Sequence, residues 1–365
     1  MEPSLKTESD KLTRSWMRHD AVMLRDYLVA GVEDPRLNLQ SIFSRHFLIR
    51  ALFGTFFEPL MEAEYRFSAV LNWLRRLTVK NRDPEELAAV LYALKRGADN
   101  AEGIEIPAYV LGAFAGLPTR AGELMVPNYV AAFLSEAQNG SGALLTEPPS
   151  LDLFRNLWQR VFLGQSATSL GTSSAFPIQS SRLARVFEPA CGSANDYRFL
   201  HACGLARFFD YTGLDLCAKN VENARTLFPQ VRFDLGNVFE LDAANQAFDF
   251  CFTHDLFEHL SIAGLEVAIR ELCRVTTVGI CAGFFNMDEI PDHVVCPLDE
   301  YHWNTLSMAR TRELFARHGF AARVFHIGTF LRQHVGCDET HNPNAYTFIL
   351  WRQYPNPRSE QEGLG

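Results

Sequence analysis

The hydrophobic pattern of the chain changes near residue 182. Before that point, apolar residues tend to recur every three to four positions, the spacing of one face of an α-helix. After it, short runs rich in β-branched and aromatic residues alternate with helical stretches. The first pattern predicts a helical region, and the second predicts strands that alternate with helices.

The first region, residues 1–165, carries helix signals and few strand signals. Its clearest helix starts at Asp83-Pro84, where Asp caps the helix and Pro occupies the first turn, and it stops at Gly97. Ser150 is expected to cap another helix with an apolar face. The remaining helices of this region are expected in residues 12–29, 37–57 and 61–77.

A segment rich in Ser, Thr and Gly, residues 166–181, has no periodic pattern, so we expect a linker or a loop there. The α/β region covers residues 182–355, and residues 356–365 are expected to form a flexible tail. Its strand candidates are residues 184–190, 211–216, 231–236, 248–253, 278–285, 322–328 and 345–351. Helical stretches separate the first five, which predicts a parallel sheet with covering helices. The last two lie close together, which favours an antiparallel pair at the sheet edge.

Composition and charge narrow the function classes. The chain has 365 residues, 47% of them hydrophobic, which is enough to bury the core of one or two domains. Its formal charge is -9, so nucleic acid is not an expected partner. The polar N-terminus lacks a secretory signal and no stretch reads as a membrane span, so we expect a cytoplasmic protein without membrane contact. The eight cysteines form no Cys-x-x-Cys pair and are expected to be reduced and buried.

One stretch carries the candidate chemistry. In residues 186–195 a strand ends near Glu188, a loop of small residues follows, and a helix begins. Small residues let the backbone approach a ligand, and a helix N-terminus offers free N–H groups. Asp215 closes the second strand, where a carboxylate accepts hydrogen bonds from ribose hydroxyls in nucleotide sites.

The loop does not fit a dinucleotide cofactor. A NAD site requires Gly-x-Gly-x-x-Gly, and the corresponding positions here are Ala190, Gly192 and Asn195. Glu188 also suits a cationic or amino-acid-bearing ligand better than a pyrophosphate. The arrangement resembles the first motif of class I S-adenosylmethionine (SAM) dependent methyltransferases, acid-x-Gly-x-Gly-x-Gly, with Ala190 and Ala194 in place of its first and third Gly.

The resemblance continues along residues 182–352. Asp215 matches the family's ribose-binding acid, and Gly236-Asn237-Val238 matches its Gly-Asp-x motif, with Asn in place of Asp. Residues 248–260 are similar to the fourth motif, and the stretches 301–304 and 312–320 are similar to the region before the sixth strand. The resemblance implies a doubly wound, seven-stranded, mainly parallel α/β sheet with an added N-terminal all-α region, SAM as cofactor and S-adenosylhomocysteine (SAH) as product. It assigns the cofactor to Glu188, Ala190, Cys191, Gly192, Ala194, Asp215, Leu216, Asn237, Val238, His254, Asp255 and Leu256.

Two histidines are the candidate catalytic residues. His254 follows the fourth predicted strand, where the methyl group is expected, so it either removes a proton from the acceptor or contacts the cofactor alone. His302 is the other candidate, and with Tyr301 and Trp303 it is expected to line the acceptor pocket. A core position for Trp303 and a surface position for Tyr301 fit the sequence equally well.

No metal site is expected. Asp255, Glu258 and His259 fall at i, i+3 and i+4, on one face of a predicted helix. They resemble the cation-binding Glu-x-x-Glu-His of ubiquinone-type O-methyltransferases, which keeps a metal as the alternative. The commoner role of Glu258 and His259 is to cap or buttress the sheet.

The resulting hypothesis is a SAM-dependent methyltransferase that methylates a small-molecule acceptor on oxygen or nitrogen by in-line displacement. Residues 1–165 are expected to cover the site, to bind the acceptor, or to pair two copies as a homodimer. Two alternatives stay open. One is a non-catalytic Rossmann-like scaffold, which the two Ala of the loop and Asn237 favour, and the other is a SAM-using enzyme with different chemistry.

Overall fold

The computed structural model describes residues 2–15, 39–54, 64–66, 68–69, 183–202, 204–337 and 342–353. The helices expected from Asp83 and Ser150, the linker 166–181, the tail 356–365 and Cys203 lie outside these residues. Residues 3–15 are helical, so a helix begins well before the predicted start at residue 12.

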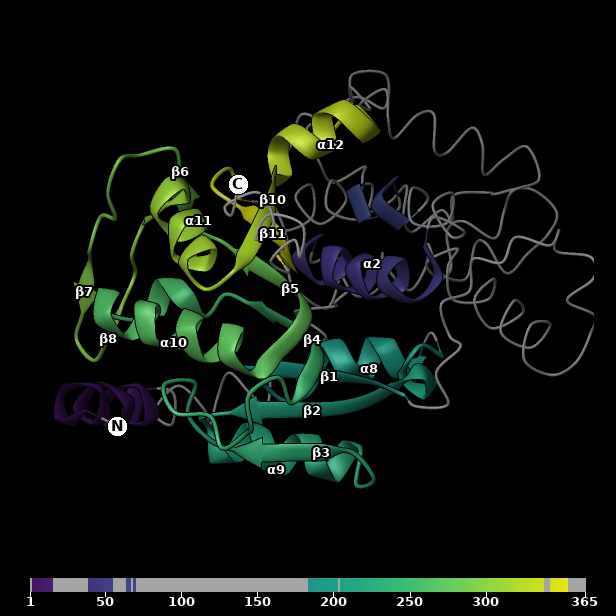
Figure 1. Cartoon of the computed structure of the whole chain (residues 1–365), viewed down its shortest axis with the longest axis horizontal. Helices are drawn as coiled ribbons and strands as arrows, with labels where there is room; N and C mark the ends of the chain where they lie inside the picture. Colours follow the sequence, from purple (N-terminus) through teal and green to yellow (C-terminus); the bar gives the residue numbers. More distant parts are fainter. Residues whose placement is uncertain are drawn as a thin grey trace, which may run out of the picture.

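Seven strands form the main sheet. They are β1 (Ala184–Pro189), β2 (Phe209–Asp215), β3 (Arg232–Leu235), β4 (Phe248–His254), β5 (Thr276–Phe284), β10 (Phe320–His326) and β11 (Tyr346–Arg352). Their order across the sheet is β10-β11-β5-β4-β1-β2-β3 (Figure 1). Strands β1 to β5 pair in parallel, and β11 runs antiparallel to both of its neighbours. The predicted seven-stranded, mainly parallel sheet and its antiparallel edge pair are therefore confirmed.

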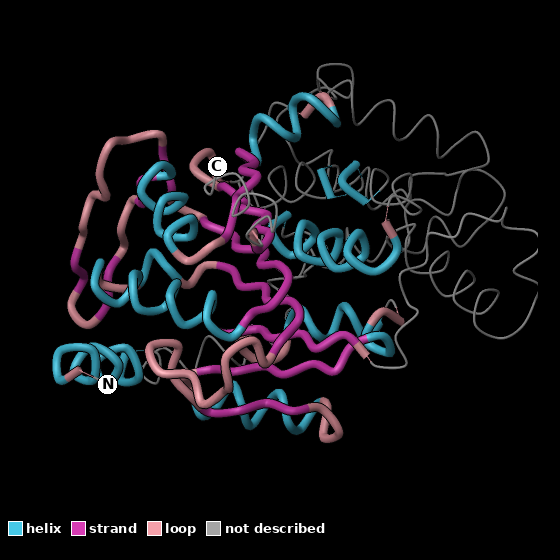
Figure 2. The backbone as a smooth tube through the Cα atoms, viewed as in Figure 1, coloured by secondary structure: helices cyan, strands magenta, loops and turns pink. Residues whose placement is uncertain are grey.

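Helices cover both faces of this sheet, as Figure 2 shows by their colours. On one face, α2 (Leu39–Phe53), α8 (Asn195–Ala202) and α9 (Ala218–Leu227) pack in one cluster with Val186 and Phe252. On the other face, α10 (Ile262–Val275), α11 (Met308–Arg317) and the helix of residues 3–15 pack with Phe187 and Cys251. Successive strand residues point to opposite faces, so strands buried on both faces appear in the sequence as continuous apolar runs.

Helix α2 joins the N-terminal region to the sheet. Phe47 packs on Phe250 and Trp351, with ring centroids 5.7 and 5.3 Å apart. Nearer its N-terminus, α2 meets α12 (Ile327–Val335) through Ile42 and Phe43. Because most residues of α2 are buried, this helix has no clear polar face. The domain boundary expected near residue 182 remains a prediction. In the structure, α2 and the main sheet contribute to one hydrophobic core.

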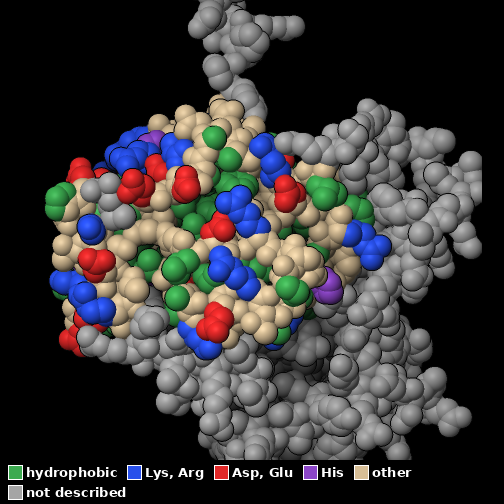
Figure 3. All heavy atoms as spheres, turned by 90° about the horizontal axis from the view of Figure 1, so that it is seen from below, with side chains coloured by type: hydrophobic (Ala, Val, Ile, Leu, Met, Phe, Trp, Pro, Cys, Tyr) green, Lys and Arg blue, Asp and Glu red, His purple; other side chains and the backbone are tan. Residues whose placement is uncertain are grey.

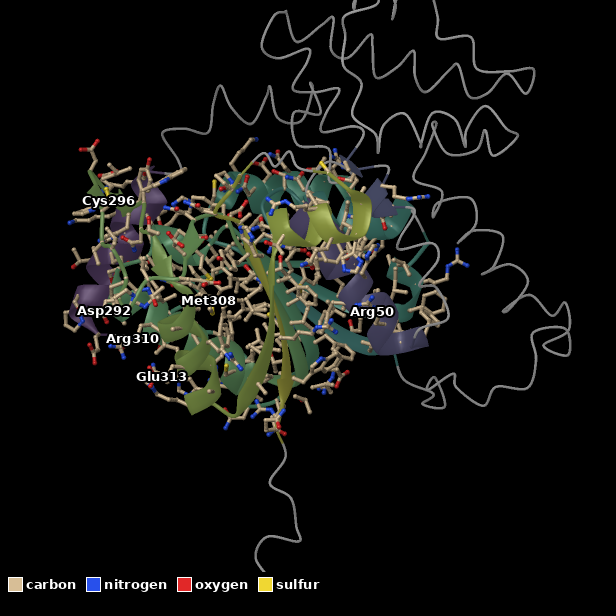
Figure 4. The ribbon with its side chains drawn as sticks, turned by 90° about the horizontal axis from the view of Figure 1, so that it is seen from above. Arg50, Asp292, Cys296, Met308, Arg310 and Glu313 are labelled. Carbon is tan, nitrogen blue, oxygen red and sulfur yellow. The ribbon has the colours of Figure 1, made fainter. Side chains whose placement is uncertain are left out.

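The described residues also bear on the membrane contact, charge distribution and cysteine state expected from the composition. None of their helices combines the length and the apolar character that crossing a membrane requires. On the face in Figure 3, acidic and basic side chains are interspersed. At the surface of α11, Arg310 pairs with Asp292 at 2.9 Å and with Glu313 at 3.4 Å (Figure 4). The seven described cysteines form no disulfide, and all but Cys296 are buried.

Candidate functional site

The site lies where β1, β2, β3 and β4 end, because open α/β sheets bind ligands at the carboxyl ends of their strands. These four strands are neighbours in the sheet (Figure 1). Residues 188–194, Asp215, Asn237 and His254 sit at the ends of β1, β2, β3 and β4 in turn. The structure thus brings the predicted cofactor residues of four strands to one edge.

The loop after β1 has the backbone of a glycine motif. Ala190, Gly192 and Ala194 have positive φ angles of 58°, 54° and 67°. A Cβ in this left-handed region approaches the following carbonyl oxygen, which costs about 1–2 kcal/mol per residue. A Cβ built on Gly192 would meet no atom within 4 Å, so this side of the loop faces open space. The three motif positions therefore need the geometry that Gly provides, and Ala adopts it at two of them.

Ala190→Gly is expected to raise the free energy of unfolding by about 0.5 kcal/mol. Relief of left-handed strain, about 1–2 kcal/mol, outweighs about 0.4–1 kcal/mol of added chain entropy in the unfolded state. Ala190 is exposed, so its methyl group contributes little packing. Urea denaturation measures the change, with Ala190→Val as the matched control that is expected to destabilise. A glycine variant less stable than the wild type would contradict the strain at this position.

Asp215 holds this loop against β2 and α9. Its carboxylate accepts hydrogen bonds from the N–H of Gly192 at 2.9 Å, the N–H of Cys217 at 2.8 Å and the side-chain amide of Asn220 at 3.1 Å. Burial raises the pKa of Asp215, and the three donors oppose that rise. The residue predicted to bind ribose therefore also orders the loop that would receive the rest of the cofactor.

Asn237, after β3, contacts the N-terminal helix. Its side-chain amide donates a hydrogen bond to the Ser9 hydroxyl, and its carbonyl oxygen accepts from the N–H of Phe239 at 2.8 Å. The neighbouring Glu8 accepts from the N–H of Ser261 at 2.6 Å and from its hydroxyl at 2.5 Å. The helix of residues 3–15 thus lies beside the position predicted for adenine.

Three apolar members of the predicted cofactor set lie on the same side of the sheet as the helix of residues 3–15. Leu216, Val238 and Leu256 all belong to or pack against the hydrophobic cluster on the α10 face of the sheet. Apolar side chains beside an amide are suited to a flat base such as adenine.

Glu188 is buried near the end of β1, with 3% of its surface exposed. It accepts a hydrogen bond from the hydroxyl of Tyr211 on β2. Burial, and then the nearby charge of Asp196, raise the pKa of Glu188 well above its ordinary value. Burial likewise raises the pKa of the Cys191 thiol. Both groups therefore favour their protonated forms in this environment.

His254, the last residue of β4, lies beneath α2. Its Nε2 is 3.0 Å from the Ser44 hydroxyl and 3.8 Å from a carboxylate oxygen of Asp196. Within the described chain its Nδ1 has no hydrogen-bond partner, and a Cβ on Gly283 would come within 2.7 Å of it. Burial lowers the pKa of His254 although the charge of Asp196 opposes this, so the imidazole is neutral at neutral pH.

The predicted acceptor residues lie on a short hairpin. Strand β8 (Tyr301–His302) pairs with β7 (Pro297–Leu298) and packs beside the short 3-10 helix Phe257–His259. The ring of His259 contacts Tyr301 and Trp303, with centroids 5.7 and 5.5 Å apart. Trp303 is 46% exposed, so it is not a core residue. The structure places His302 beside His259, whereas His254 lies under α2.

The helix predicted through Asp255, Glu258 and His259 is wrong. Asp255 has a φ of 49° and residues 257–259 form a 3-10 turn, because α10 begins only at Ile262. Glu258 accepts hydrogen bonds from the N–H groups of Phe285 at 2.6 Å and Asn286 at 3.2 Å. His259 donates to the carbonyl of His302 at 3.1 Å. The described residues contain no group of three or more His, Cys, Asp or Glu that could hold a metal ion.

Glu258 is expected to make stability fall as pH rises. Burial, and then the Asp255 charge, raise its pKa to about 8. The unfolded chain loses this proton near its ordinary pKa of about 4.3, so between these values the folded state binds more protons and its stability declines with pH. Glu258→Gln keeps an oxygen for the two backbone N–H groups and is expected to flatten the decline. Urea denaturation between about pH 5 and 8 tests this, and identical slopes in both proteins would refute the assignment.

Four residues of this edge were missed by sequence reasoning: Glu8, Ser9, Ser44 and Asp196. The first three come from the helical region, and Ser44 is separated from His254 by 210 positions, so no local pattern connects them. Asp196 carried a usable signal, because it stands in the first turn of the helix that follows the small-residue loop.

The chain is similar to methyltransferases. Residues 186–279 match a family model described as a methyltransferase domain. No curated protein matches the chain. A solved SAM-dependent methyltransferase from Methanosarcina mazei is 13% identical, covers 48% of this chain and 95% of its own, and has a TM-score of 0.38. One from Mesorhizobium loti is 14% identical, covers 46% and 90%, and has a TM-score of 0.37.

A third solved structure is magnesium protoporphyrin IX methyltransferase from Synechocystis PCC 6803, with bound SAM. It is 15% identical, covers 47% of this chain and 71% of its own, and has a TM-score of 0.34. None of these likenesses identifies the substrate of this chain. The family match spans β1 to β5, the strands that carry the loop, Asp215, Asn237 and His254. Residues 186–279 are therefore similar to a methyltransferase domain, and they lie within the seven-stranded, mainly parallel sheet that the resemblance to class I SAM-dependent methyltransferases implies.

Proposed function

We propose that this enzyme transfers the methyl group of SAM to an oxygen or nitrogen atom of a small-molecule acceptor. The observation that carries the proposal is the cover over His254. Ser44 of α2 lies 3.0 Å from its imidazole, and Gln40 lies within 3.1 Å of the Cβ position of Gly283 beside it. A reaction site that is covered by a helix of the same chain can enclose a small acceptor. A macromolecular acceptor would instead need an open surface.

The residues present fit SAM. The left-handed loop of residues 190–194 leaves open space beside Gly192. Asp215 would hold the ribose and Asn237 the adenine edge, with apolar contacts from the neighbouring leucines and valine. When bound, SAM supplies a methyl group activated by the adjacent sulfonium. The buried Glu188 lies at the same edge, and the positive charge of the bound ligand would favour its ionised form.

His254 would take the proton of the acceptor. Its lowered pKa leaves the imidazole neutral and able to accept a proton at neutral pH. The acceptor atom forms the new bond to carbon as the bond from sulfur to that carbon breaks, and the acceptor proton moves to the imidazole. The remaining contribution of the chain is positional, because in-line geometry accounts for much of the rate gain in such displacements.

The helical region supplies the cover in this proposal. Residues 3–15 contact Asn237, and α2 contacts His254, so these two described helices of the region touch predicted site residues. Residues 301–303 would form the outer wall of the acceptor pocket. Pairing of two copies through residues 1–165 and a cytoplasmic location stay predictions.

Isothermal titration of the full-length protein with SAH tests the cofactor, and transfer of an isotope-labelled methyl group from SAM into fractionated metabolites tests the acceptor. We expect saturable binding of SAH and label in the small-molecule fraction. Failure of the wild type to bind both SAM and SAH would overturn the proposed function. Label found only in protein or RNA would overturn the acceptor class.

A further inference from the structure

The imidazole of His254 has polar contacts on only one of its two ring nitrogens. Its Nε2 lies 3.0 Å from the hydroxyl oxygen of Ser44 on α2 and 3.8 Å from a carboxylate oxygen of Asp196. Within the described part of the chain Nδ1 has no hydrogen-bond partner, and the side chain is only 8% exposed. Burial lowers the pKa of His254 and keeps the ring neutral, so only one of the two nitrogens carries a hydrogen.

The groups around Nε2 indicate that this hydrogen lies on Nε2. The Ser44 hydroxyl has one hydrogen, which it donates to the sulfur of Cys281 at 3.5 Å, so its oxygen is left to accept from the imidazole. The nearby carboxylate of Asp196, when ionised, can only accept. Two acceptors therefore favour an N–H at Nε2, and Nδ1 keeps a bare lone pair.

Nδ1 faces a position on β5 that has no side chain. Gly283 pairs with His254 in the sheet, and a Cβ built on Gly283 would come 2.7 Å from Nδ1. Any other residue at this position would therefore press on the nitrogen. From the side of α2, two side-chain carbons of Gln40 lie 3.1 Å from the same Cβ position. Glycine thus keeps β5 clear of Nδ1, and the side chain that borders this nitrogen belongs to a helix of the cover.

We propose that Ser44 is a positioning residue, which holds His254 in the tautomer with its hydrogen on Nε2 and thereby makes Nδ1 the atom that accepts the proton. As the acceptor atom bonds to the methyl carbon and the carbon–sulfur bond breaks, the hydrogen of the acceptor passes to Nδ1. The resulting imidazolium keeps its Nε2–H toward Ser44 and the carboxylate of Asp196. The side chain of Gln40 turns aside to admit the acceptor. This inference rests on the proposed function, which assigns the proton to the imidazole without choosing a nitrogen.

The simpler explanation is that Ser44 only satisfies a buried nitrogen where α2 packs on the sheet. That role predicts that Ser44→Ala lowers thermal stability and leaves the rate of methyl transfer by the folded protein unchanged. The positioning role predicts slower transfer with normal cofactor binding, because the ring then adopts both tautomers. The tautomer of His254 and the rate of transfer therefore separate the two explanations.

Nuclear magnetic resonance of the full-length protein, labelled with a nitrogen isotope in its histidines, reports the tautomer directly. A bare ring nitrogen and an N–H nitrogen have different chemical shifts, and His254→Gln identifies the signals of His254 by their loss. We expect a bare Nδ1 in the wild type and a mixture of tautomers in Ser44→Ala. Ser44→Thr, which keeps the hydroxyl, is expected to restore the single tautomer. Ser41→Ala removes another buried hydroxyl from α2 and is expected to leave the His254 signals unchanged.

Transfer of a labelled methyl group from excess SAM into a metabolite extract gives the functional readout. Ser44→Ala is expected to slow this transfer by about 10- to 100-fold and to bind SAH within about threefold of the wild type. Gly283→Ala, whose methyl group would press on Nδ1, is expected to lose transfer as well. Gly279→Ala is the matched control, because its Cβ on the same strand would meet aromatic rings at 2.9 and 3.0 Å, and it is expected to transfer normally.

Each outcome is decisive. A wild type with its hydrogen on Nδ1, or a Ser44→Ala variant that transfers methyl at the wild-type rate, overturns the inference while the proposed function stands. A loss of SAH affinity in Ser44→Ala as large as its loss of transfer also overturns it, since the variant then disturbs the cofactor site. A wild type that binds neither SAM nor SAH overturns the proposed function and the inference with it.

Discussion

Asp215→Ala is expected to weaken SAH binding by about 100-fold or more. The carboxylate is 7% exposed and accepts hydrogen bonds from the N–H of Gly192, the N–H of Cys217 and the side chain of Asn220. The substitution removes the proposed ribose contact and also releases the loop after β1 from β2. Both effects act on the same ligand, so the loss exceeds that of a single hydrogen bond. Isothermal titration with SAH measures it.

A matched control separates binding from folding. Asp234 lies on the neighbouring strand β3 and pairs with Arg232 at the surface, so Asp234→Ala is expected to bind SAH like the wild type. Thermal unfolding of Asp215→Ala without ligand reports the structural part of its defect. If this variant binds SAH within threefold of the wild type, Asp215 has no part in the cofactor site.

The main sheet was predictable because its information is local. Strands β1, β4 and β5 are apolar runs that can be recognised without knowledge of their partners. The short separation of β10 and β11 in the sequence predicted their antiparallel pairing, although their connection contains α12 and is not only the expected polar loop. The loop after β1 was predictable for the same reason, since its small residues and the acid before it are adjacent in the chain. Local patterns of this kind locate the edge at which a ligand binds.

The parts that cover this edge were not predictable from local pattern. The helix of residues 3–15 is polar in sequence, and its position depends on Leu5 and Leu12 meeting a cluster that includes Phe239. Ser9 reaches Asn237 across 228 positions. The strands β6 (Met287–Asp288) and β9 (Leu306–Ser307) are too short to show an alternation. Such contacts are set by tertiary packing, which propensity and periodicity do not record.

The contacts of Glu64 are likewise set by tertiary packing. Among the substitutions considered, replacement of Glu64 is expected to have the largest effect on stability. Its carboxylate accepts hydrogen bonds from Arg45 and His46, each at 2.6 Å, and all three side chains are at most 3% exposed. Burial raises the pKa of Glu64, but the charge of Arg45 and the two donors outweigh it and lower the pKa to about 2. Arg45 in turn lies over the ring of Phe199 of α8, so this network links α2 to the helix that follows the loop after β1.

Glu64→Ala is therefore expected to lower the free energy of unfolding by about 3–5 kcal/mol, because it leaves the Arg45 guanidinium buried without its counter-charge. Urea denaturation at neutral pH measures the change. The control is Asp292→Asn, which breaks the exposed pair with Arg310 and is expected to leave the free energy of unfolding nearly unchanged. The double variant Arg45→Met with Glu64→Met replaces both charges by apolar groups and is expected to recover much of the loss. A cost for Glu64→Ala as small as that of the exposed pair would show that Arg45 reaches solvent, and α2 would then not be the buried link between the helical region and the sheet.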